Sequence, residues 1–342
     1  MSVASTSARY SRQELFAGVG PEGQARLRRG RVLVVGAGAL GSALAEMMVR
    51  AGVAALTVVD RDYVETSNLQ RQSLYDEGDV DRGLAKAAAA EAKLKRINSE
   101  VEVRGVVADL ASDNAAEILR GHDLVLDGTD NFETRFLVND VCVREGVPWV
   151  YGACVGSYGL ALAVRPRVSP CLRCVLEERP EAGGGPTCDT VGVIAPIVHV
   201  VAGIQAAEAM KLLAGRHDAL LPGIVAVDLW TGQFSVVDLS GSRPSCPACT
   251  LGRYDYAGAA SAPTVLCGRD AVQIRPGPTG ALDLEALAAR LSGAGRVLRN
   301  EHLVRFEAPG AEIVVFRDGR AIVKGARDAA EARSLYARYV GN

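Results

Sequence analysis

A glycine-rich loop and the polar segment that follows it carry the residues best suited to chemistry. The loop reads GAGALG over residues 36–41, a GxGxxG spacing that lets a phosphate approach backbone N–H groups. The segment Asp60–Ser73 opens with a carboxylate suited to ribose hydroxyls and continues to an amide, Asn68, and a cation, Arg71. An NAD site has no obvious need for that amide and cation. Cleavage of ATP, in contrast, needs cationic groups against the triphosphate.

A strand and a helix must flank the loop if it is to bind phosphate. The apolar run Arg31–Val35 predicts the strand, Ala39–Ala51 predicts the helix, which Gly52 closes, and Ala55–Val59 predicts the next strand. This βαβ order places the loop at a helix N-terminus. It also places Asp60 at the end of the second strand, where a carboxylate accepts hydrogen bonds from a ribose.

The alternation of strands and helices continues along the chain. Helices are expected near residues 84–97, 114–119 and 132–145, and strands near 101–107, 123–127 and 149–153. The fold class is therefore α/β, with a Rossmann-like, doubly wound, mostly parallel sheet. Strand-like segments at 160–165, 224–228 and 234–239, around a helix at 196–213, are expected to extend that sheet in antiparallel or mixed fashion.

Composition divides the chain near its last quarter. Residues 256–263 read YAGAASAP, which has the small side chains of a linker. We expect residues 1–255 to form the nucleotide-binding domain and residues 264–342 to form a small α+β domain. Its expected elements are helices at 283–291 and 329–339, strands at 303–307, 312–316 and 320–323, and a hairpin turn at 318–319.

Charge and hydropathy exclude several classes of partner. The 342 residues include 38 Lys and Arg against 40 Asp and Glu, so nothing favours a nucleic-acid or anionic-membrane surface. The longest apolar stretch, Val191–Ile204, contains Pro196 and His199 and is shorter than the ~20 residues of a membrane span. Eight cysteines without a secretion signal indicate metal or thiol chemistry in a reducing compartment. A cytoplasmic protein is expected.

Four of the cysteines form two C-x-x-C pairs, Cys171 with Cys174 and Cys246 with Cys249. Four thiolates supply a closed tetrahedral zinc site, whose role would be structural. The two pairs lie farther apart than in a compact zinc ribbon, and a redox-active C-x-x-C is the other interpretation.

Several motifs together resemble a known family over about residues 8–252. They are Arg9-Tyr10-Ser11-Arg12-Gln13, the run Asn68 to Gln72, Lys86 in a Gly-Leu-Ala-Lys segment, and Gly128-Thr129-Asp130-Asn131. In this order they resemble the MoeB/ThiF/HesA adenylyltransferases, relatives of the ubiquitin-activating enzymes.

The resemblance implies an ATP-dependent reaction on a protein. The C-terminal glycine carboxylate of a ubiquitin-fold sulfur carrier of the MoaD or ThiS kind, ending in Gly-Gly, attacks the α-phosphate of ATP. The products are an acyl-adenylate and pyrophosphate, in molybdopterin, thiamine or tRNA-thiolation sulfur transfer. Fixed cations and Mg²⁺ offset the charge repulsion in such an attack.

The resemblance also implies the residues of the site. ATP would lie at Gly36, Gly38 and Gly41, with Asp60 on the ribose. Arg71 and Lys86 match phosphate-contacting cations, and Asn68 matches a polar contact beside them. Asp130, next to Asn131, matches a carboxylate that positions Mg²⁺.

Three further features concern partners and sulfur. Arg12 matches an arginine that reaches the triphosphate from the partner subunit, which implies a homodimer. Cys188 matches a cysteine that forms a covalent link with the carrier in some members, and a packing role is the other interpretation. The resemblance also places zinc at the two cysteine pairs. A sulfurtransferase or cysteine desulfurase is a further expected partner.

The C-terminal ~80 residues are open to several interpretations. Longer members end in a rhodanese domain, but this unit is too short, and Cys267 stands at its beginning rather than in an active loop. The unit could recruit the carrier, contact a partner subunit or dock a sulfur donor. Alternative functions for the whole chain are activation of a ubiquitin-like modifier for protein conjugation, an NAD-dependent oxidoreductase, and a binding scaffold without activity.

Overall fold

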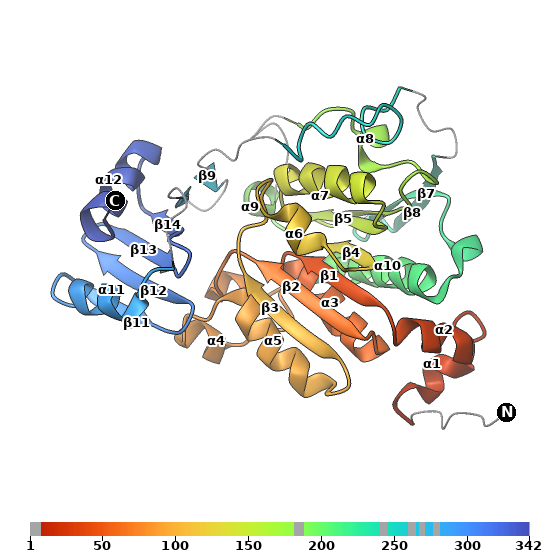
Figure 1. Ribbon diagram of the computed structural model, residues 1–342, viewed down its shortest axis with the longest axis horizontal. Coiled ribbons are helices and arrows are strands. Elements are labelled where there is room, and N and C mark those ends of the chain that lie inside the picture. Colours follow the sequence, from red (N-terminus) through yellow and green to blue (C-terminus); the bar gives the residue numbers. More distant parts are fainter. Residues whose placement is uncertain are drawn as a thin grey trace. The chain divides into compact units, whose positions relative to one another are not determined.

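The computed structural model describes residues 8–180, 188–239, 245–258, 265–266, 271–275 and 281–341 (Figure 1). The chain forms two compact units. The first unit comprises the chain up to Arg61, then Ser67–Tyr75, and then the described residues from Lys86 to 258. The second comprises Asp62–Thr66, Asp76–Ala85 and the described residues from 265 onward. The chain therefore changes unit several times near the motif that follows Asp60.

The first unit is built on an eight-stranded sheet with the order β3-β2-β1-β4-β5-β6-β7-β8. Its strands are β1 (Arg31–Val35), β2 (Ala55–Asp60), β3 (Glu102–Val107), β4 (Leu124–Asp127), β5 (Trp149–Val155), β6 (Tyr158–Val164), β7 (Gly223–Asp228) and β8 (Gln233–Asp238). The first five strands in this order, β3, β2, β1, β4 and β5, run parallel to one another. Strands β6, β7 and β8 continue the sheet, each antiparallel to its neighbour. The expected fold class is thus confirmed.

Helices cover both faces of this sheet (Figure 1). One face carries α3 (Ala39–Ala51), α5 (Lys86–Ile97) and α10 (Ala195–Ala214), and the other carries α6 (Ala115–Leu119) and α7 (Phe132–Glu145). Strand β4 is buried along its whole length, as expected of a central parallel strand between two helical layers. α10 is long and apolar enough to cross a membrane by composition alone, but half of its most apolar window is buried inside the protein.

Shorter helices complete the first unit and its connections. They are η1 (Ala8–Tyr10), α1 (Ser11–Leu15), α2 (Gly20–Leu27), η2 (Thr66–Asn68), α8 (Leu172–Val175), α9 (Cys188–Val191) and η3 (His217–Ala219). α7 begins at an Asn131 cap and ends at Gly146 with φ 75°, a left-handed conformation that glycine adopts without strain.

The second unit contains a six-stranded antiparallel sheet with the order β11-β12-β13-β14-β10-β9. The strands are β9 (Val265–Leu266), β10 (Ala271–Ile274), β11 (Arg296–Arg299), β12 (Leu303–Ala308), β13 (Ala311–Phe316) and β14 (Ala321–Lys324). Its helices are α4 (Glu77–Asp81), α11 (Leu284–Leu291) and α12 (Ala329–Tyr339). Apolar side chains of α11, α12 and the sheet form one core, which makes this an α+β unit.

Some boundaries differ from the sequence pattern. Strands β9, β10 and β11 have no counterpart among the expected elements, because none is longer than four residues and β11 begins and ends with arginine, at Arg296 and Arg299. Tyr256 and Ala257, the first residues of the expected linker, pack against the core of the first unit.

Candidate nucleotide site and cysteine cluster

The glycine loop lies where the strand order of the sheet reverses. Gly36 follows β1 with φ 87°, and a Cβ on it would lie 2.7 Å from the carbonyl oxygen of Gly128, after β4. A Cβ on Gly41 would lie only 1.7 Å from the Gly36 carbonyl oxygen. Only glycine fits these positions, so the loops after β1 and β4 meet in close contact. In open α/β sheets, ligands bind beside the loops at this point of strand reversal.

Asp60 lies at the end of β2, and its carboxylate is fixed against the glycine loop. Its Oδ2 accepts a hydrogen bond of 2.6 Å from the backbone N–H of Ala37. The side chain is only half-buried. A ligand at the loop could therefore reach this carboxylate, as the sequence pattern requires of a ribose contact.

The segment with Asn68 and Arg71 is folded tightly on itself. Asn68 ends η2, is 2% exposed, and its carbonyl oxygen accepts hydrogen bonds from the N–H groups of Arg71 and Gln72. Arg71 is half-buried, and its Nη1 donates 2.9 Å to the Ser67 carbonyl. The Gln72 Nε2 atom lies 3.8 Å from where a Cβ on Gly38 would be. The segment therefore lies against the glycine loop.

Tyr75 belongs to this site although no sequence motif included it, and so does Gln72, which the run Asn68 to Gln72 included without a role. Gln72 is 3% exposed, and within the described part of the chain its Oε1 has no hydrogen-bond partner. The Tyr75 hydroxyl lies 2.7 Å from the Ala37 carbonyl oxygen and 3.2 Å from that of Lys86. Tyr75 thereby joins the glycine loop to the first residue of α5. The available signal was their position, since Gln72 lies four residues after Asn68 and Tyr75 lies four residues after Arg71.

Lys86 begins α5, and its side chain is 2% exposed. A buried ammonium group is costly unless anionic or polar groups surround it. The Tyr75 contact places the backbone of Lys86 beside the glycine loop. The contacts thus place Asp60 and the backbone of Lys86 beside the glycine loop, with Asn68 in the segment that packs against it.

A buried ion pair supports the second loop, which follows β4. Burial raises the pKa of Asp127, although the nearby Arg135 guanidinium acts in the opposite direction. Asp127 Oδ1 accepts hydrogen bonds from the backbone N–H and Oγ1 of Thr129 at 2.9 and 2.7 Å. Arg135 Nη2 donates to the carbonyls of Thr129 (2.7 Å) and Gly152 (3.0 Å). These contacts hold the loop that carries the next two expected residues.

Asp130 and Asn131 both lie on that loop, but the Asp130 side chain is exposed and the Asn131 side chain caps a helix. The Asp130 side chain is exposed, so its oxygens suit a hard cation such as Mg²⁺. Asn131 is the N-cap of α7, and its Oδ1 accepts 2.9 Å from the Thr134 N–H. That oxygen is therefore engaged in the fold, and its Nδ2 donates 3.4 Å to Asp130.

Three expected residues are not joined to this site by the contacts in the structure. Arg12 lies on α1, is exposed, and has no ion-pair partner within the described residues. Cys188 begins α9, and its side chain lies outside the described part of the chain. Cys267 lies outside the described residues altogether.

The four cysteines of the two C-x-x-C pairs meet in one cluster. Their sulfurs all lie within 4.8 Å of one another. Cys171 Sγ is 3.9 Å from Cys174 Sγ and 3.6 Å from Cys246 Sγ, and Cys174 Sγ is 3.3 Å from Cys249 Sγ. Tetrahedral zinc with bonds of about 2.3 Å requires sulfurs roughly 3.8 Å apart. The cluster therefore fits zinc, and three of its members are buried.

Without a cation, the thiols of Cys171 and Cys249 resist ionisation. The hydrogen bond with Cys174 and then burial raise the pKa of Cys171, and burial and then the Cys171 charge raise the pKa of Cys249. A divalent cation reverses this balance, because it stabilises the thiolates that otherwise repel one another.

The protein around the cluster is strongly tied to α7. The Asn139 Oδ1 atom accepts 2.9 Å from the Leu172 N–H, which fixes the first turn of α8. Arg173, between the two cysteines of its pair, contacts Asp140 at 3.3 Å and Asp255 at 3.0 Å. Its guanidinium also lies 5.0 Å from the centroid of the Tyr256 ring.

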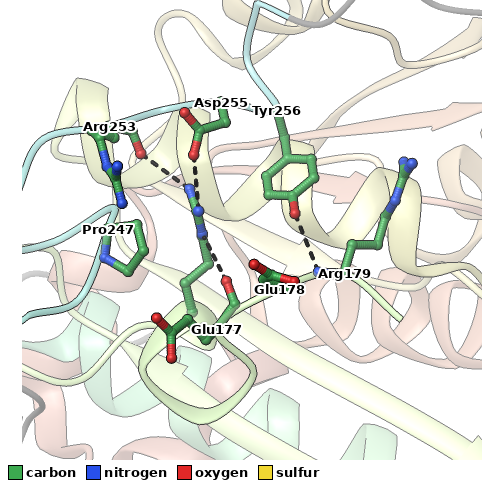
Figure 2. Close-up of a pocket in the computed structure, with 8 residues that line it drawn as sticks. Glu177, Glu178, Arg179, Pro247, Arg253, Asp255 and Tyr256 are labelled. Atoms are coloured by element: carbon green, nitrogen blue, oxygen red, sulfur yellow. Dashed lines mark hydrogen bonds and ion pairs between the residues drawn. The ribbon is translucent and has the colours of Figure 1, made fainter. Parts of the chain in front are cut away.

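A pocket of about 420 Å³ lies beside these contacts (Figure 2). Its lining residues are Arg173, Glu177, Glu178, Arg179, Pro247, Arg253, Asp255 and Tyr256. The charges of three arginines and three carboxylates cancel in this lining, so the pocket carries no excess positive charge. A triphosphate, which is strongly anionic, needs such an excess.

Comparison with known proteins shows extensive similarity. The ThiF family profile matches residues 10–248. The sulfur carrier protein ThiS adenylyltransferase of Bacillus subtilis (strain 168) is 48% identical over 338 residues, covering 97% of this chain and 99% of the relative. The SAMP-activating enzyme E1 of Haloferax volcanii is 43% identical over 247 residues, covering 72% and 90%. A crystal structure of E. coli MccB with succinimide shares the fold, with TM-score 0.62, 22% identity and coverage of 71% and 75%.

Proposed function

The chain belongs to the ThiF family, and we propose that it is an ATP-dependent adenylyltransferase that activates a ubiquitin-like sulfur-carrier protein. One observation carries this function. The relative named a sulfur carrier protein ThiS adenylyltransferase is 48% identical over 97% of this chain and 99% of its own length. The enzyme joins the C-terminal glycine carboxylate of the carrier to AMP and releases pyrophosphate. A carrier of the ThiS kind is the preferred substrate, and molybdopterin and tRNA-thiolation carriers are the alternatives.

The geometry supports ATP at the glycine loop. Asp60 would accept hydrogen bonds from the ribose, and the loop at Gly36, Gly38 and Gly41 would approach the phosphates at the N-terminus of α3. Asn68, Arg71 and Lys86 would face the triphosphate. Gln72 adds a buried amide with an unpaired Oε1 atom beside them.

The attacking carboxylate and the triphosphate are both anionic, so the reaction needs fixed positive charge. Lys86 is suited to this task because burial strengthens its electrostatic interactions. Asp130 would hold Mg²⁺, which when bound offsets charge on the departing pyrophosphate. Asn131 would act chiefly by capping α7 and orienting the loop of Asp130, because its Oδ1 is engaged with Thr134.

Zinc is proposed at Cys171, Cys174, Cys246 and Cys249, where four thiolates leave no open position for a substrate. Its role would be to hold α8 against the strands and against α7. The chemistry of four thiols in mutual contact supports this choice over a redox disulfide pair.

The proposal also covers the binding partners of the protein and its cellular compartment. Arg12, exposed on α1, would reach the triphosphate of a second copy in a homodimer. Cys188 would form a covalent link with the activated carrier, and a sulfurtransferase or cysteine desulfurase would supply the sulfur. The cytoplasm is the compartment proposed for these reactions, since the cluster thiols need reducing conditions. The proposed adenylation domain comprises residues 1–255. Residues 256–263 are the proposed linker, and residues 264–342 are the proposed C-terminal domain.

A second candidate function is activation of a ubiquitin-like modifier for protein conjugation. The relative named SAMP-activating enzyme E1 favours it, at 43% identity over 72% of this chain. The two functions share the adenylation step and differ in the fate of the carrier. A thiocarboxylate on the carrier C-terminus indicates sulfur transfer, and an isopeptide bond to lysine indicates conjugation.

The proposal is tested by carrier-dependent exchange of labelled pyrophosphate into ATP, measured with the full chain and a ThiS-like carrier. Exchange is expected with the intact carrier and none with a carrier that lacks its last glycine. Nucleotide binding without exchange, under conditions where the carrier is folded, would argue against the function.

A further inference from the structure

The segment with Asn68 and Arg71 is flanked in sequence, on both sides, by stretches that belong to the second unit. We call Asp62–Thr66 and Asp76–Ala85 the anchor segments, since both belong to the second unit while Ser67–Tyr75 between them belongs to the first. Lys86, the first residue after the second anchor segment, returns to the first unit. The residues proposed to face the triphosphate therefore lie next to points where the chain changes unit.

A polar network around the buried Tyr63 holds the first anchor segment. Tyr63 is 1% exposed, and its hydroxyl donates 2.9 Å to Glu312 Oε1 on β13. Lys324 on β14 pairs with Glu65 and with Glu312 (3.5 Å), and its Nζ lies 5.0 Å from the centroid of the Tyr63 ring. Arg305 on β12 binds the other Glu312 oxygen at 2.7 Å. Three adjacent strands of the second sheet thus contribute to one contact with this segment.

The protonation states of this network favour a stable hydrogen bond. Burial, together with the charges of Glu65 and Glu312, raises the pKa of Tyr63, so its hydroxyl remains a neutral donor. Burial alone would raise the pKa of Glu312, but the hydrogen bonds from Tyr63 and Arg305 outweigh it and lower that pKa. Glu312 therefore remains a charged acceptor, and such hydrogen bonds are stronger than neutral ones.

The second anchor segment is held by Asn300, in the turn between β11 and β12. Its Nδ2 donates to the carbonyls of Gly83 (2.9 Å) and Arg82 (3.3 Å). Its Oδ1 accepts from the N–H groups of His302 (2.9 Å) and Leu303 (3.0 Å). The two accepted bonds fix the orientation of the amide, so its donor side faces the anchor segment. One side chain therefore joins two turns that are far apart in sequence.

The two anchor segments also bind each other. Tyr63 and Ala85 form an antiparallel bridge, and the Val64 N–H donates 2.9 Å to the Leu84 carbonyl. Only nine residues, Ser67–Tyr75, lie between the segments. A connection this short, closed at its base, has few conformations left to it.

We propose that Tyr63, Glu312 and Asn300 position ATP-binding residues: they hold the two anchor segments, which close the base of Ser67–Tyr75, where Asn68 and Arg71 lie, and lead directly into Lys86. This inference rests on the proposed adenylation function. Tyr63, Glu312 and Asn300 are positioning residues, which act on ATP only through the segment they hold. Preorganised cations stabilise charge best because they need not move during the reaction.

Two variants remove the anchoring bonds with little other change. Asn300→Asp keeps the acceptor for His302 and Leu303 but cannot donate to Gly83 and Arg82, and Tyr63→Phe removes only the hydroxyl. Each is expected to raise the KM for ATP about fivefold in the exchange reaction, on the scale of the one or two hydrogen bonds that it removes. The KM for the carrier is expected to stay within about twofold, because the carrier does not depend on Asn68 or Arg71 for binding.

The matched control is Arg296→Ala, which removes an exposed ion pair with Glu307 (3.9 Å) in the same sheet and contacts neither anchor segment. Backbone hydrogen exchange is measured in parallel on full-length protein without nucleotide. Faster exchange over residues 62–86 is expected in both anchoring variants and not in the control.

Unchanged hydrogen exchange over 67–75 in both variants would overturn the inference. Faster exchange there with an unchanged KM for ATP would also overturn it, since the segment would then be held for a reason unrelated to ATP. If the wild-type protein shows no pyrophosphate exchange, the proposed function fails. The hydrogen-exchange comparison, repeated with ATP present, then decides the positioning role by whether ATP protects residues 67–75 less in the variants.

Discussion

The nucleotide site and the cysteine cluster lie in the same unit but are assembled differently. The residues around the glycine loop come chiefly from one continuous stretch, 36–86, in which the loop follows β1 and Asp60 ends β2. The cysteine cluster joins pairs that are 75 residues apart in the chain. At the first site the side chains surround a loop suited to a ligand, and at the second the four sulfurs face one another.

This difference predicts opposite responses to mutation. A change in a side chain at the nucleotide site is expected to slow the reaction while leaving the fold intact. A change in the cysteine cluster is expected to weaken the fold while leaving the reaction nearly unchanged. Glycines of the loop are the exception, because they are needed for close backbone packing as well.

The largest effect is expected from Lys86→Ala. Loss of this buried cation is predicted to slow carrier-dependent pyrophosphate exchange about 10²–10³-fold, as for the loss of one preorganised charge-stabilising group. Lys95→Ala is the control, because Lys95 lies on the same helix, is exposed and pairs with Glu91. Equal exchange rates for the two variants would remove Lys86 from the site.

Gly41→Ala tests whether the glycines of the loop are needed for close backbone packing. Its new Cβ would lie 1.7 Å from the Gly36 carbonyl oxygen, so the two loops must move apart. The free energy of unfolding in urea is expected to fall by about 3 kcal/mol. Gly203→Ala is the matched control, because Gly203 also lies inside a helix and nothing lies within 4 Å of its added Cβ.

Gly203→Ala is expected to stabilise the protein by about 0.5–1 kcal/mol through helix propensity. A Gly41→Ala protein as stable as this control would contradict the close approach of the loops after β1 and β4.

Cys249→Ser gives the smallest expected effect and the sharpest contrast. Loss of one ligand is predicted to lower zinc content, measured by elemental mass spectrometry, and to reduce the free energy of unfolding by about 2 kcal/mol. Pyrophosphate exchange at 25 °C is expected to stay within about twofold of wild type. Cys154→Ser, a half-buried cysteine outside the cluster, is the control.

A large loss of pyrophosphate exchange in Cys249→Ser, with an unchanged free energy of unfolding, would contradict the structural role of the cluster and place it in the reaction. Unchanged zinc content would exclude Cys249 as a ligand.

Much of the first unit could be predicted from periodicity and turn residues. The helices Ala39–Ala51 and Phe132–Glu145 have the expected bounds, since glycines with positive φ end both. Asp60 and the glycine loop were also predictable, because their relation depends on one βαβ unit. Tyr75 was not, since its residue type does not distinguish a ligand contact from a surface position, and Gln72 stood in a quoted motif without a predicted role.

The segment after Asp60 shows how much a sequence pattern can predict. Its Asn and Arg distinguish it from an NAD site, and a local motif suffices for that conclusion. Nothing in the spacing indicates that Tyr63 would bond Glu312, 249 residues later, or that Asn300 would bond Gly83.

The sequence by itself determined the α/β class, the nucleotide loop and the kinds of residue around it, because these depend on contacts between neighbours in the chain. The tertiary structure decided between the shared cysteine site and the redox pair that the sequence left open, and it alone showed that the anchor segments close the base of the segment with Asn68 and Arg71. Both depend on contacts between residues far apart in sequence. Such contacts are set by the packing of whole elements, which no short pattern records.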